Sequence, residues 1–250
     1  MQRDELYLRM LANLTRFYRR LGEGSGGVLE RDGVLACLCP PASTRSFFNG
    51  VVYTDGGALR DALDEIAAAY DAAGVAAWTV WVPEEDRETA AALQAAGNVL
   101  DAEPRAMAAP LEEIDVGDGA GGIEWRHAER FEEIAPIAGP AFGVSPRVTL
   151  EAGEGLRDEV RFVVARAGPV DAACVGALDL DGDRGIYMVA TLERARGRGL
   201  ATALMRQALL EAREQGMGTT SLQATRMGAH IYAGLGYRDL GAIQMWERRR

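Results

Sequence analysis

A glycine-rich turn between an apolar strand and an amphipathic helix constrains this chain more than any other segment. The apolar run 186–190 predicts a buried strand, and apolar residues from Leu200 to Ala212 recur with the period of a helix. Gly216 follows the last of them and suits a helix C-cap. A turn that leads into a helix N-terminus aims several unpaired backbone N–H groups, and the positive end of the helix dipole, at one point. The segment therefore predicts a phosphate-binding turn in an α/β fold.

The residues of the turn decide between phosphate ligands. The segment lacks the Gly-Lys-Ser/Thr ending of an ATP-binding P-loop and the glycine spacing of a dinucleotide-binding loop. It reads Arg196-Gly197-Arg198-Gly199-Leu200-Ala201, which is similar to the Arg/Gln-x-x-Gly-x-Gly/Ala signature of the GNAT superfamily of N-acetyltransferases. Taken alone, a pattern of this length also fits a solvated basic turn.

The residues after the helix carry a second pattern. Residues 219–224 predict a strand, and residues 227–237 predict a short helix that presents Tyr232 and ends in Leu-Gly-Tyr. This resembles the second GNAT signature, and the two signatures stand in the family's order, at a family-like separation, within residues 122–250. The resemblance implies an α/β (α+β) fold in which a mixed, mostly antiparallel sheet is flanked by helices.

The resemblance also implies acetyl-CoA as the co-substrate and assigns residues to it. Main-chain groups of the strand that enters the turn would hydrogen-bond the pantetheine arm, in a V-shaped cleft where this strand splays from the strand near residues 222–224. Amides of the turn would hold the pyrophosphate, and the Thr202 hydroxyl would add a hydrogen bond. The implied cofactor-binding residues are Val189, Ala190, Thr191, Arg196, Gly197, Arg198, Gly199, Leu200, Ala201 and Thr202. No metal is expected.

The implied reaction is acetyl transfer from the thioester to a primary amine, by direct attack in a ternary complex. The amine must attack unprotonated, and the departing thiolate needs a proton, which a positioned phenol can supply. Tyr232 is the predicted catalytic residue; the alternative is a tyrosine packed in a hydrophobic seam. His230 is not predicted as the base, because residues two apart on a helix point about 200° apart.

The general base stays open. Some relatives use a carboxylate early on the central strand, near the place of Asp181 and Asp183, but turn chemistry explains both aspartates equally well. The chain also departs from the family pattern at two positions. Glu193 stands where many relatives have proline, and Thr225 stands where an asparagine often precedes the tyrosine. Any contact of that asparagine with the cofactor is therefore not expected here.

The first half of the chain repeats the second in outline. A shift of 142 positions lays Gly57 on Gly199 and Gly74 on Gly216, and the order helix, strand, short helix, strand, strand occurs twice. Phosphate binding is predicted in the second half only, because Asp55 lies in the corresponding turn of the first half and would repel a phosphate. Chance alignment of alanine-rich helices is the alternative. We predict two GNAT-like domains: a degenerate domain at 1–113, a linker rich in glycine and aspartate at 114–122, and a catalytic domain at 123–250.

Composition limits the partners and the location. The formal net charge of −10 argues against nucleic acid and anionic membranes and favours a cationic amine over an acidic one. No apolar run is long enough to span a membrane, and the pattern from Tyr7 to Leu21 predicts an amphipathic helix rather than a secretory signal. Every basic residue is arginine, which with abundant alanine and glycine indicates a GC-rich bacterial genome. Apolar surroundings predict buried cytoplasmic thiols at Cys37, Cys39 and Cys174.

Two classes of function follow from these observations. The first is an acetyl-CoA-dependent N-acetyltransferase acting on a small-molecule amine, with the second domain catalytic and the first supporting it or shaping its substrate entrance. The second is a non-catalytic acyl-CoA-binding sensor or assembly module, since the first half already shows the loss of such a site. The two-domain plan also permits a relative of mycothiol synthase, although no residue requires it. The identity of the amine and the oligomeric state stay open.

Overall fold

One path of hydrogen-bonded strands runs through the whole chain. The structure, a computed structural model, describes residues 1–250, with every side chain except that of Met227. The strands are β1 (Gly27–Arg31), β2 (Val34–Leu38), β3 (Gly50–Tyr53), β4 (Ala77–Pro83), β5 (Val99–Ala102), β6 (Arg105–Pro110), β7 (Trp125–His127), β8 (Val160–Ala167), β9 (Val170–Leu180), β10 (Asp183–Thr191), β11 (Thr219–Ala224) and β12 (Arg238–Arg249). Their order is β1-β2-β3-β4-β12-β6-β11-β10-β9-β8-β7, with β5 paired to β12. Only β3–β4 and β10–β11 are parallel among the described pairs, which confirms the predicted mixed, mostly antiparallel sheet.

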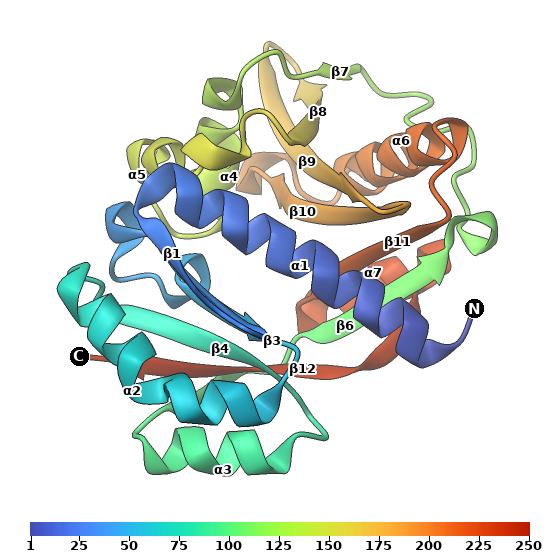
Figure 1. Ribbon diagram of the computed structural model, residues 1–250. Coiled ribbons are helices and arrows are strands. Elements are labelled where there is room, and N and C mark those ends of the chain that lie inside the picture. Colours follow the sequence, from blue (N-terminus) through green and yellow to red (C-terminus); the bar gives the residue numbers. More distant parts are fainter.

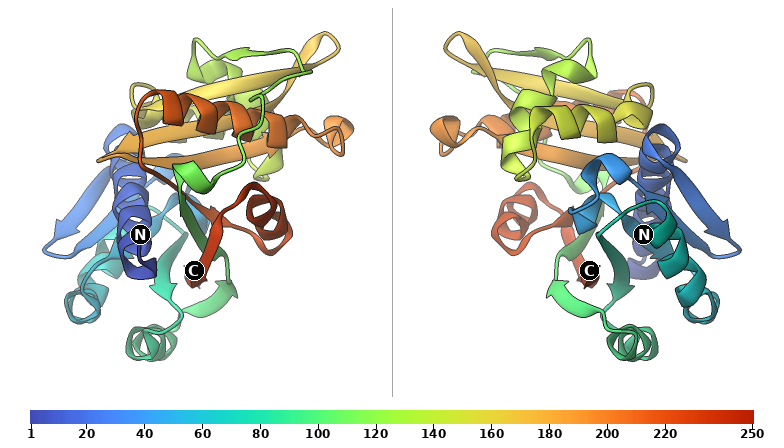
Figure 2. Two further views of the ribbon diagram at one scale, coloured as in Figure 1. Left: turned by 90° about the vertical axis from the view of Figure 1, so that its right-hand side faces the viewer. Right: turned by 90° about the vertical axis from the view of Figure 1, so that its left-hand side faces the viewer.

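Helices cover both faces of this sheet. They are α1 (Arg3–Ser25), α2 (Gly56–Ala72), α3 (Arg87–Ala95), α4 (Ala135–Ala141), α5 (Pro146–Ala152), α6 (Leu200–Glu214) and α7 (Arg226–Leu235). Figure 2 shows the sheet bending between an upper part that carries α6 and a lower part that carries α2 and α3. One hydrophobic core lies under α6, a second lies under α2, and a third lies between the two parts and includes side chains of α1 and α4.

The last strand of each half completes the sheet of the other half. β6 pairs with β11 along the full length of β11, from Thr219 to Ala224. The C-terminal part of β12, from Ile243 to Arg249, pairs with β4 in the first half. β4 lies between β3 and β12, and β6 lies between β12 and β11, so the exchange leaves neither strand with an open edge. The predicted division into two domains at 114–122 stays a prediction. Residues before and after this linker contribute strands to both parts of the sheet.

The N-terminal helix ties the two parts together. α1 runs diagonally across the sheet in Figure 1 and packs against β2, β6, β10 and β11. The predicted apolar face is confirmed, since Met10, Leu14 and Leu21 are buried. Asn13 is buried on the same face, and its Nδ2 donates to the Leu178 carbonyl at 3.2 Å. A buried amide requires such partners, so this contact fixes the position of α1 on the strands.

The buried thiols are confirmed as well. Cys37, Cys39 and Cys174 are free and buried. Burial raises the pKa of the Cys174 thiol to about 12, so this sulfur is uncharged at neutral pH. Within the described residues, no helix is both long enough and apolar enough to cross a bilayer.

For the region after the linker, the sequence predicts a strand at 123–126 and one helix at 128–138, and the structure differs from both. The strand β7 begins at Trp125, and the helix is broken into a 3-10 turn, Phe131–Glu133, followed by α4. Pro136 explains the break, because proline fits the first turn of a helix and disrupts an interior. The helix α5 was not predicted, although its signal is present: Ser145 caps it by accepting from the Val148 N–H at 3.3 Å, just before Pro146.

Candidate active site

The turn between β10 and α6 holds a row of free main-chain donors. Gly197 and Gly199 both have φ of +74°, a conformation that favours glycine, and Gly199 is the N-cap of α6. The first helical hydrogen bond runs from the Ala203 N–H to the Gly199 carbonyl at 3.0 Å. Among the described residues, no acceptor is found for the N–H groups of residues 197–202. The predicted anion-binding turn is therefore open at the residues that were expected to form it.

The electrostatics of the turn favour an anion. Arg194, Arg196 and Arg198 are exposed, and none of the ion pairs among the described residues includes them. The Nε of Arg196 donates to the Thr191 carbonyl at 3.3 Å. In a chain with a net charge of −10, three unpaired cations beside a helix N-terminus form a local positive site.

The equivalent turn of the first half is closed by its own carboxylate. Asp55 is the N-cap of α2, and its Oδ1 accepts from the Gly57 N–H at 2.8 Å and from the Ala58 N–H at 3.1 Å. This capping stabilises α2 by about 1 kcal/mol. The same carboxylate uses the donors that a phosphate would need and adds a negative charge at that place. Each turn thus connects a strand to the helix that leads to a parallel strand, but the α6 turn offers free N–H donors and the α2 turn presents a carboxylate.

A buried arginine fixes α6 above the strand that leads to the open turn. Arg184 on β10 is 1% exposed, and its guanidinium pairs with both carboxylate oxygens of Asp179 at 2.6 and 2.7 Å. Its Nη1 also donates to the Ala208 carbonyl of α6 at 2.6 Å. These bonds hold the helix, and with it the row of N–H groups, in one orientation relative to β10.

β10 and β11 splay apart, as predicted. They pair only where Asp183–Gly185 face Thr219–Ser221. Farther along, Met188 has φ of +50° and lies in a bulge where the β9–β10 register shifts. A cavity of about 470 Å³ opens at the splay, lined on the β10 side by 186–189. Of the predicted pantetheine-binding residues, Val189 lines this cavity, whereas Ala190 and Thr191 continue along β9 toward the turn.

The predicted catalytic residue, Tyr232, is on α7. It is half-buried on α7 and lines the cavity together with Leu222 of β11 and Thr225, which precedes α7. Burial raises the pKa of Tyr232 to about 12, so the phenol keeps its proton at neutral pH. Thr225, at the position where relatives often have asparagine, is the N-cap of α7. Its hydroxyl accepts from the Gly228 N–H at 3.2 Å. His230 is exposed on α7 and does not line the cavity.

The turn, the splayed strands and Tyr232 fall within one family match. Residues 158–239 match the model described as an acetyltransferase (GNAT) domain. We call residues 158–239 the GNAT domain, after this match. Its open turn and its cavity are the two features that the sequence signatures predicted. No curated protein matches the chain.

Solved structures extend the likeness to nearly the whole chain. A GCN5-related N-acetyltransferase from Kribbella flavida is 19% identical over 97% of this chain and 95% of its own, with a TM-score of 0.70. A tandem GNAT protein from the clavulanic acid biosynthesis pathway is 14% identical over 96% of this chain and 95% of its own, with a TM-score of 0.62. A functionally unknown conserved protein from Staphylococcus epidermidis is 11% identical over 89% and 93%, with a TM-score of 0.63. The predicted fold class and the resemblance to the GNAT superfamily are confirmed.

The two aspartates considered as a base lie outside the cavity of the GNAT domain. Asp181 is in the β9–β10 turn with φ of +47°, and its carbonyl accepts from Arg9 Nη1 at 3.1 Å. Asp183 is 2% exposed, and its carboxylate accepts from Thr219 and Ser221 hydroxyls at 2.7 and 2.6 Å. Burial raises the pKa of Asp183, and these hydroxyls oppose that effect. Among the residues whose side chains are described, no group of three or more His, Cys, Asp or Glu is placed to hold a metal.

Part of the cavity lies outside the GNAT domain and was not predicted from the sequence. Side chains of α1, the 3-10 helix Ser46–Phe48, β4 and β5 reach it. The only charged side chain among its described lining residues is Asp101 of β5. No motif indicated these contacts, because they come from segments that are far apart in sequence and meet only through the exchange of β6 and β12.

Proposed function

We propose that this protein is an acetyl-CoA-dependent N-acetyltransferase that transfers the acetyl group to a primary amine of a small molecule, by direct attack in a ternary complex. The observation that carries the proposal is the row of free N–H groups at residues 197–202, at the end of a strand that also lines a cavity with Tyr232. The GNAT domain supports acyltransfer as the reaction class. The turn would bind the pyrophosphate, and the cavity would hold the pantetheine arm and the acceptor.

The residues of the turn fit a diphosphate. A side-chain atom added at Gly197 or Gly199 would meet no atom within 4 Å, so the approach to the donors is open. The amides of 197–202 would donate to phosphate oxygens, the Thr202 hydroxyl would add a donor, and Arg196 and Arg198 would balance the charge. Val189, Ala190 and Thr191 would offer main-chain groups to the amides of the arm. When bound, acetyl-CoA supplies the thioester carbonyl and the thiolate leaving group.

Tyr232 is the residue that we assign to the proton of the leaving thiolate. The acceptor attacks as an uncharged amine, its nitrogen bonds to the carbonyl carbon, and the carbon–sulfur bond breaks. The phenol of Tyr232 gives its proton to the sulfur, and the proton lost by the amine nitrogen passes to solvent and then restores the phenol. A phenol with a pKa of about 12 keeps its proton at neutral pH, so Tyr232 can donate that proton as the carbon–sulfur bond breaks and negative charge builds on the sulfur.

Titration calorimetry combined with a CoA-release assay tests the proposal. We expect acetyl-CoA to bind with a stoichiometry of one per chain and a Kd in the micromolar range, on the order of 1–100 µM. Free CoA should then appear only when an amine is added. Absence of binding at high micromolar acetyl-CoA would overturn the proposal.

A second function has its own support in the chain. In the α2 turn, Asp55 occupies the N–H groups of Gly57 and Ala58, and this supports the loss of ligand binding at one of two similar turns. The protein would then be a non-catalytic acyl-CoA-binding sensor or assembly module. This alternative predicts tight acetyl-CoA binding with no CoA release above the hydrolysis background, over a panel of amines that vary in size, charge and ring content.

The partners and location that we propose rest on composition. The net charge of −10 supports a small-molecule amine rather than nucleic acid or a membrane as the partner. Three buried free thiols support a reducing, cytoplasmic location, and the exclusive use of arginine supports a bacterial source.

A further inference from the structure

Aromatic rings from both halves of the chain form a large part of the cavity lining. Five of the six phenylalanines of the protein line it, although they come from four separate segments. These rings, with the tyrosines and the tryptophan that join them, are Phe17, Tyr18, Phe47, Phe48, Trp81, Phe131, Phe142, Tyr187 and Tyr232. The part next to β10 and β11 is where the pantetheine arm would lie. The part formed by α1, the 3-10 helix 46–48 and β4 lies on the side of the first half.

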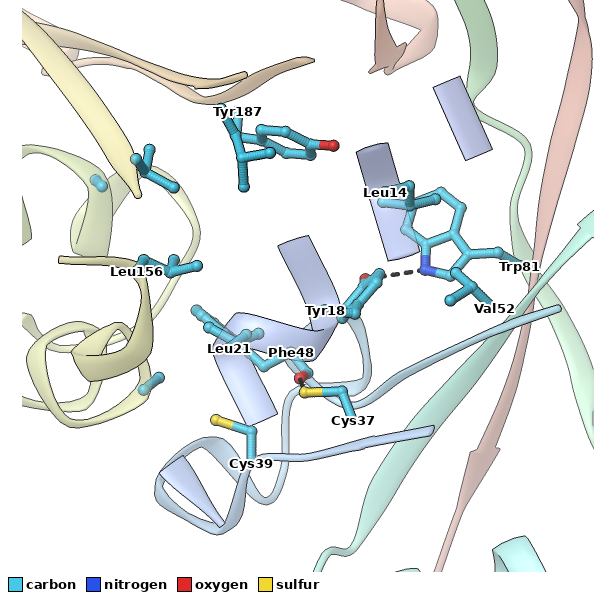
Figure 3. Close-up of a cluster of buried hydrophobic side chains, with 14 of the residues drawn as sticks. Leu14, Tyr18, Leu21, Cys37, Cys39, Phe48, Val52, Trp81, Leu156 and Tyr187 are labelled. Atoms are coloured by element: carbon cyan, nitrogen blue, oxygen red, sulfur yellow. Dashed lines mark hydrogen bonds between the residues drawn. The ribbon is translucent and has the colours of Figure 1, made fainter. Parts of the chain in front are cut away.

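The polar atoms of Tyr18, Trp81 and Tyr187 are used within the wall. The indole N–H of Trp81 donates to the Tyr18 hydroxyl at 2.9 Å, and that hydroxyl donates to the Phe47 carbonyl at 2.7 Å. Figure 3 shows the hydrogen bond between Trp81 and Tyr18, with Tyr187 on another strand, β10. The Tyr187 hydroxyl donates to Asn13 Oδ1 at 3.0 Å, and its ring stacks on Phe17 at 4.2 Å. The wall therefore presents carbon surface and ring faces, and it is held in place before any ligand arrives.

One carboxylate stands at the rim of this apolar wall. Asp101 on β5 is exposed and is the only charged residue among the described lining residues. Its neighbour Glu103 points elsewhere, since its carboxylate accepts from the Gln244 amide at 3.1 Å. A single negative charge beside ring faces is complementary to an ammonium group on an apolar body.

We propose that the acceptor is an amine carried on an aromatic body, such as an arylalkylamine. Its ring packs among the rings of the first half, and Asp101 attracts its ammonium at the entrance before the nitrogen loses its proton. This inference rests on the proposed acetyltransferase function and gives the first half a role, as the wall of the acceptor pocket. Polyamines and amino sugars fit poorly, because each extra charge or hydroxyl would be buried without a partner and would weaken binding about ten-fold.

The test compares amines and variants in steady-state kinetics with acetyl-CoA. The probes are 2-phenylethylamine, spermidine and glucosamine. We expect kcat/KM for 2-phenylethylamine to exceed the other two at least about 100-fold. Asp101→Asn and Phe47→Ala should each raise KM for 2-phenylethylamine about ten-fold and leave the Kd of acetyl-CoA unchanged. Glu103→Gln is the matched control, a neighbouring exposed carboxylate that should change neither value.

The outcomes separate this inference from the proposed function. If acetyl-CoA does not bind, both are wrong. If acetyl-CoA binds but spermidine or glucosamine is preferred, or if Asp101→Asn behaves like Glu103→Gln, the acceptor class is wrong while the proposed function stands. A rate that rises about ten-fold or more from acetyl-CoA to octanoyl-CoA, without preference among amines, would also overturn the inference, because the apolar wall would then hold the acyl chain. Circular dichroism melting of Phe47→Ala controls for loss of folding.

Discussion

Replacing Gly199 with aspartate should weaken acetyl-CoA binding about thirty-fold relative to asparagine at the same position. The aspartate would place at the N-terminus of α6 the carboxylate that Asp55 already places at the N-terminus of α2. A negative charge about 5 Å from a phosphate costs about 2 kcal/mol in a partly screened site, and this energy corresponds to the expected change in Kd. Calorimetric titration of both variants measures the difference.

Gly199→Asn is the matched control for this experiment. Asparagine and aspartate have the same shape, both tolerate the left-handed conformation that Gly199 adopts at φ of +74°, and both find open space at this position. The strain of the backbone is therefore shared, and only the charge differs. The difference in the Kd of acetyl-CoA between the two variants should become smaller at about 0.5 M salt, because salt screens the added charge. Equal Kd values for the two variants would show that no phosphate lies at this turn.

Replacing Tyr232 with phenylalanine should lower kcat about 100-fold and change the Kd of acetyl-CoA less than about two-fold. The variant keeps the ring that packs in the cavity at 6.0 Å from the ring of Tyr237, and it loses only the proton donor. General acid catalysis contributes at least about 100-fold in rate. Single-turnover CoA release gives the rate, and calorimetry gives the binding. Unchanged turnover would show that Tyr232 is a packing residue, which was the alternative interpretation of the sequence.

The pH dependence gives a second test of Tyr232. The protonated phenol is the active form, and its pKa is raised to about 12 by burial, so deprotonation of Tyr232 removes activity only as the pH approaches 12. The rate should therefore rise from pH 6 to about pH 9 as the amine loses its proton, with no falling limb in that range. A falling limb centred near pH 8–9 that is absent from the phenylalanine variant would contradict the assignment of a high pKa to this phenol.

The second half of the chain was largely predictable because its signals are local. The turn at 197–199 needs glycine at two left-handed positions, and the helix after it shows apolar periodicity up to the glycine that ends it. The splay at β10 follows from the same family pattern. The break in the helix expected at 128–138 was not predicted, because the apolar periodicity continues across Pro136, which lies in the first turn of α4.

The acceptor side of the cavity could not be predicted, because it depends on contacts across long distances in sequence. Trp81 meets Tyr18 only because α1 crosses the sheet, and β4 reaches this place only because β12 pairs with it. Periodicity identified α1, β4 and β12 as elements, but it carries no information about which strand lies beside which. Asp101 has no motif around it and gains significance only as the one charge in an apolar wall.

The most direct test of the account is the amide spectrum of the intact, isotope-labelled protein during titration with acetyl-CoA. The free N–H groups of residues 197–202 should shift strongly as they bind the pyrophosphate, while the amides of Gly57 and Ala58, which already donate to Asp55, should not move. Desulfo-CoA, which lacks the thioester and retains the pyrophosphate, should produce the same shifts. Saturable binding that leaves residues 197–202 unshifted, or that shifts the α2 turn instead, would contradict the account.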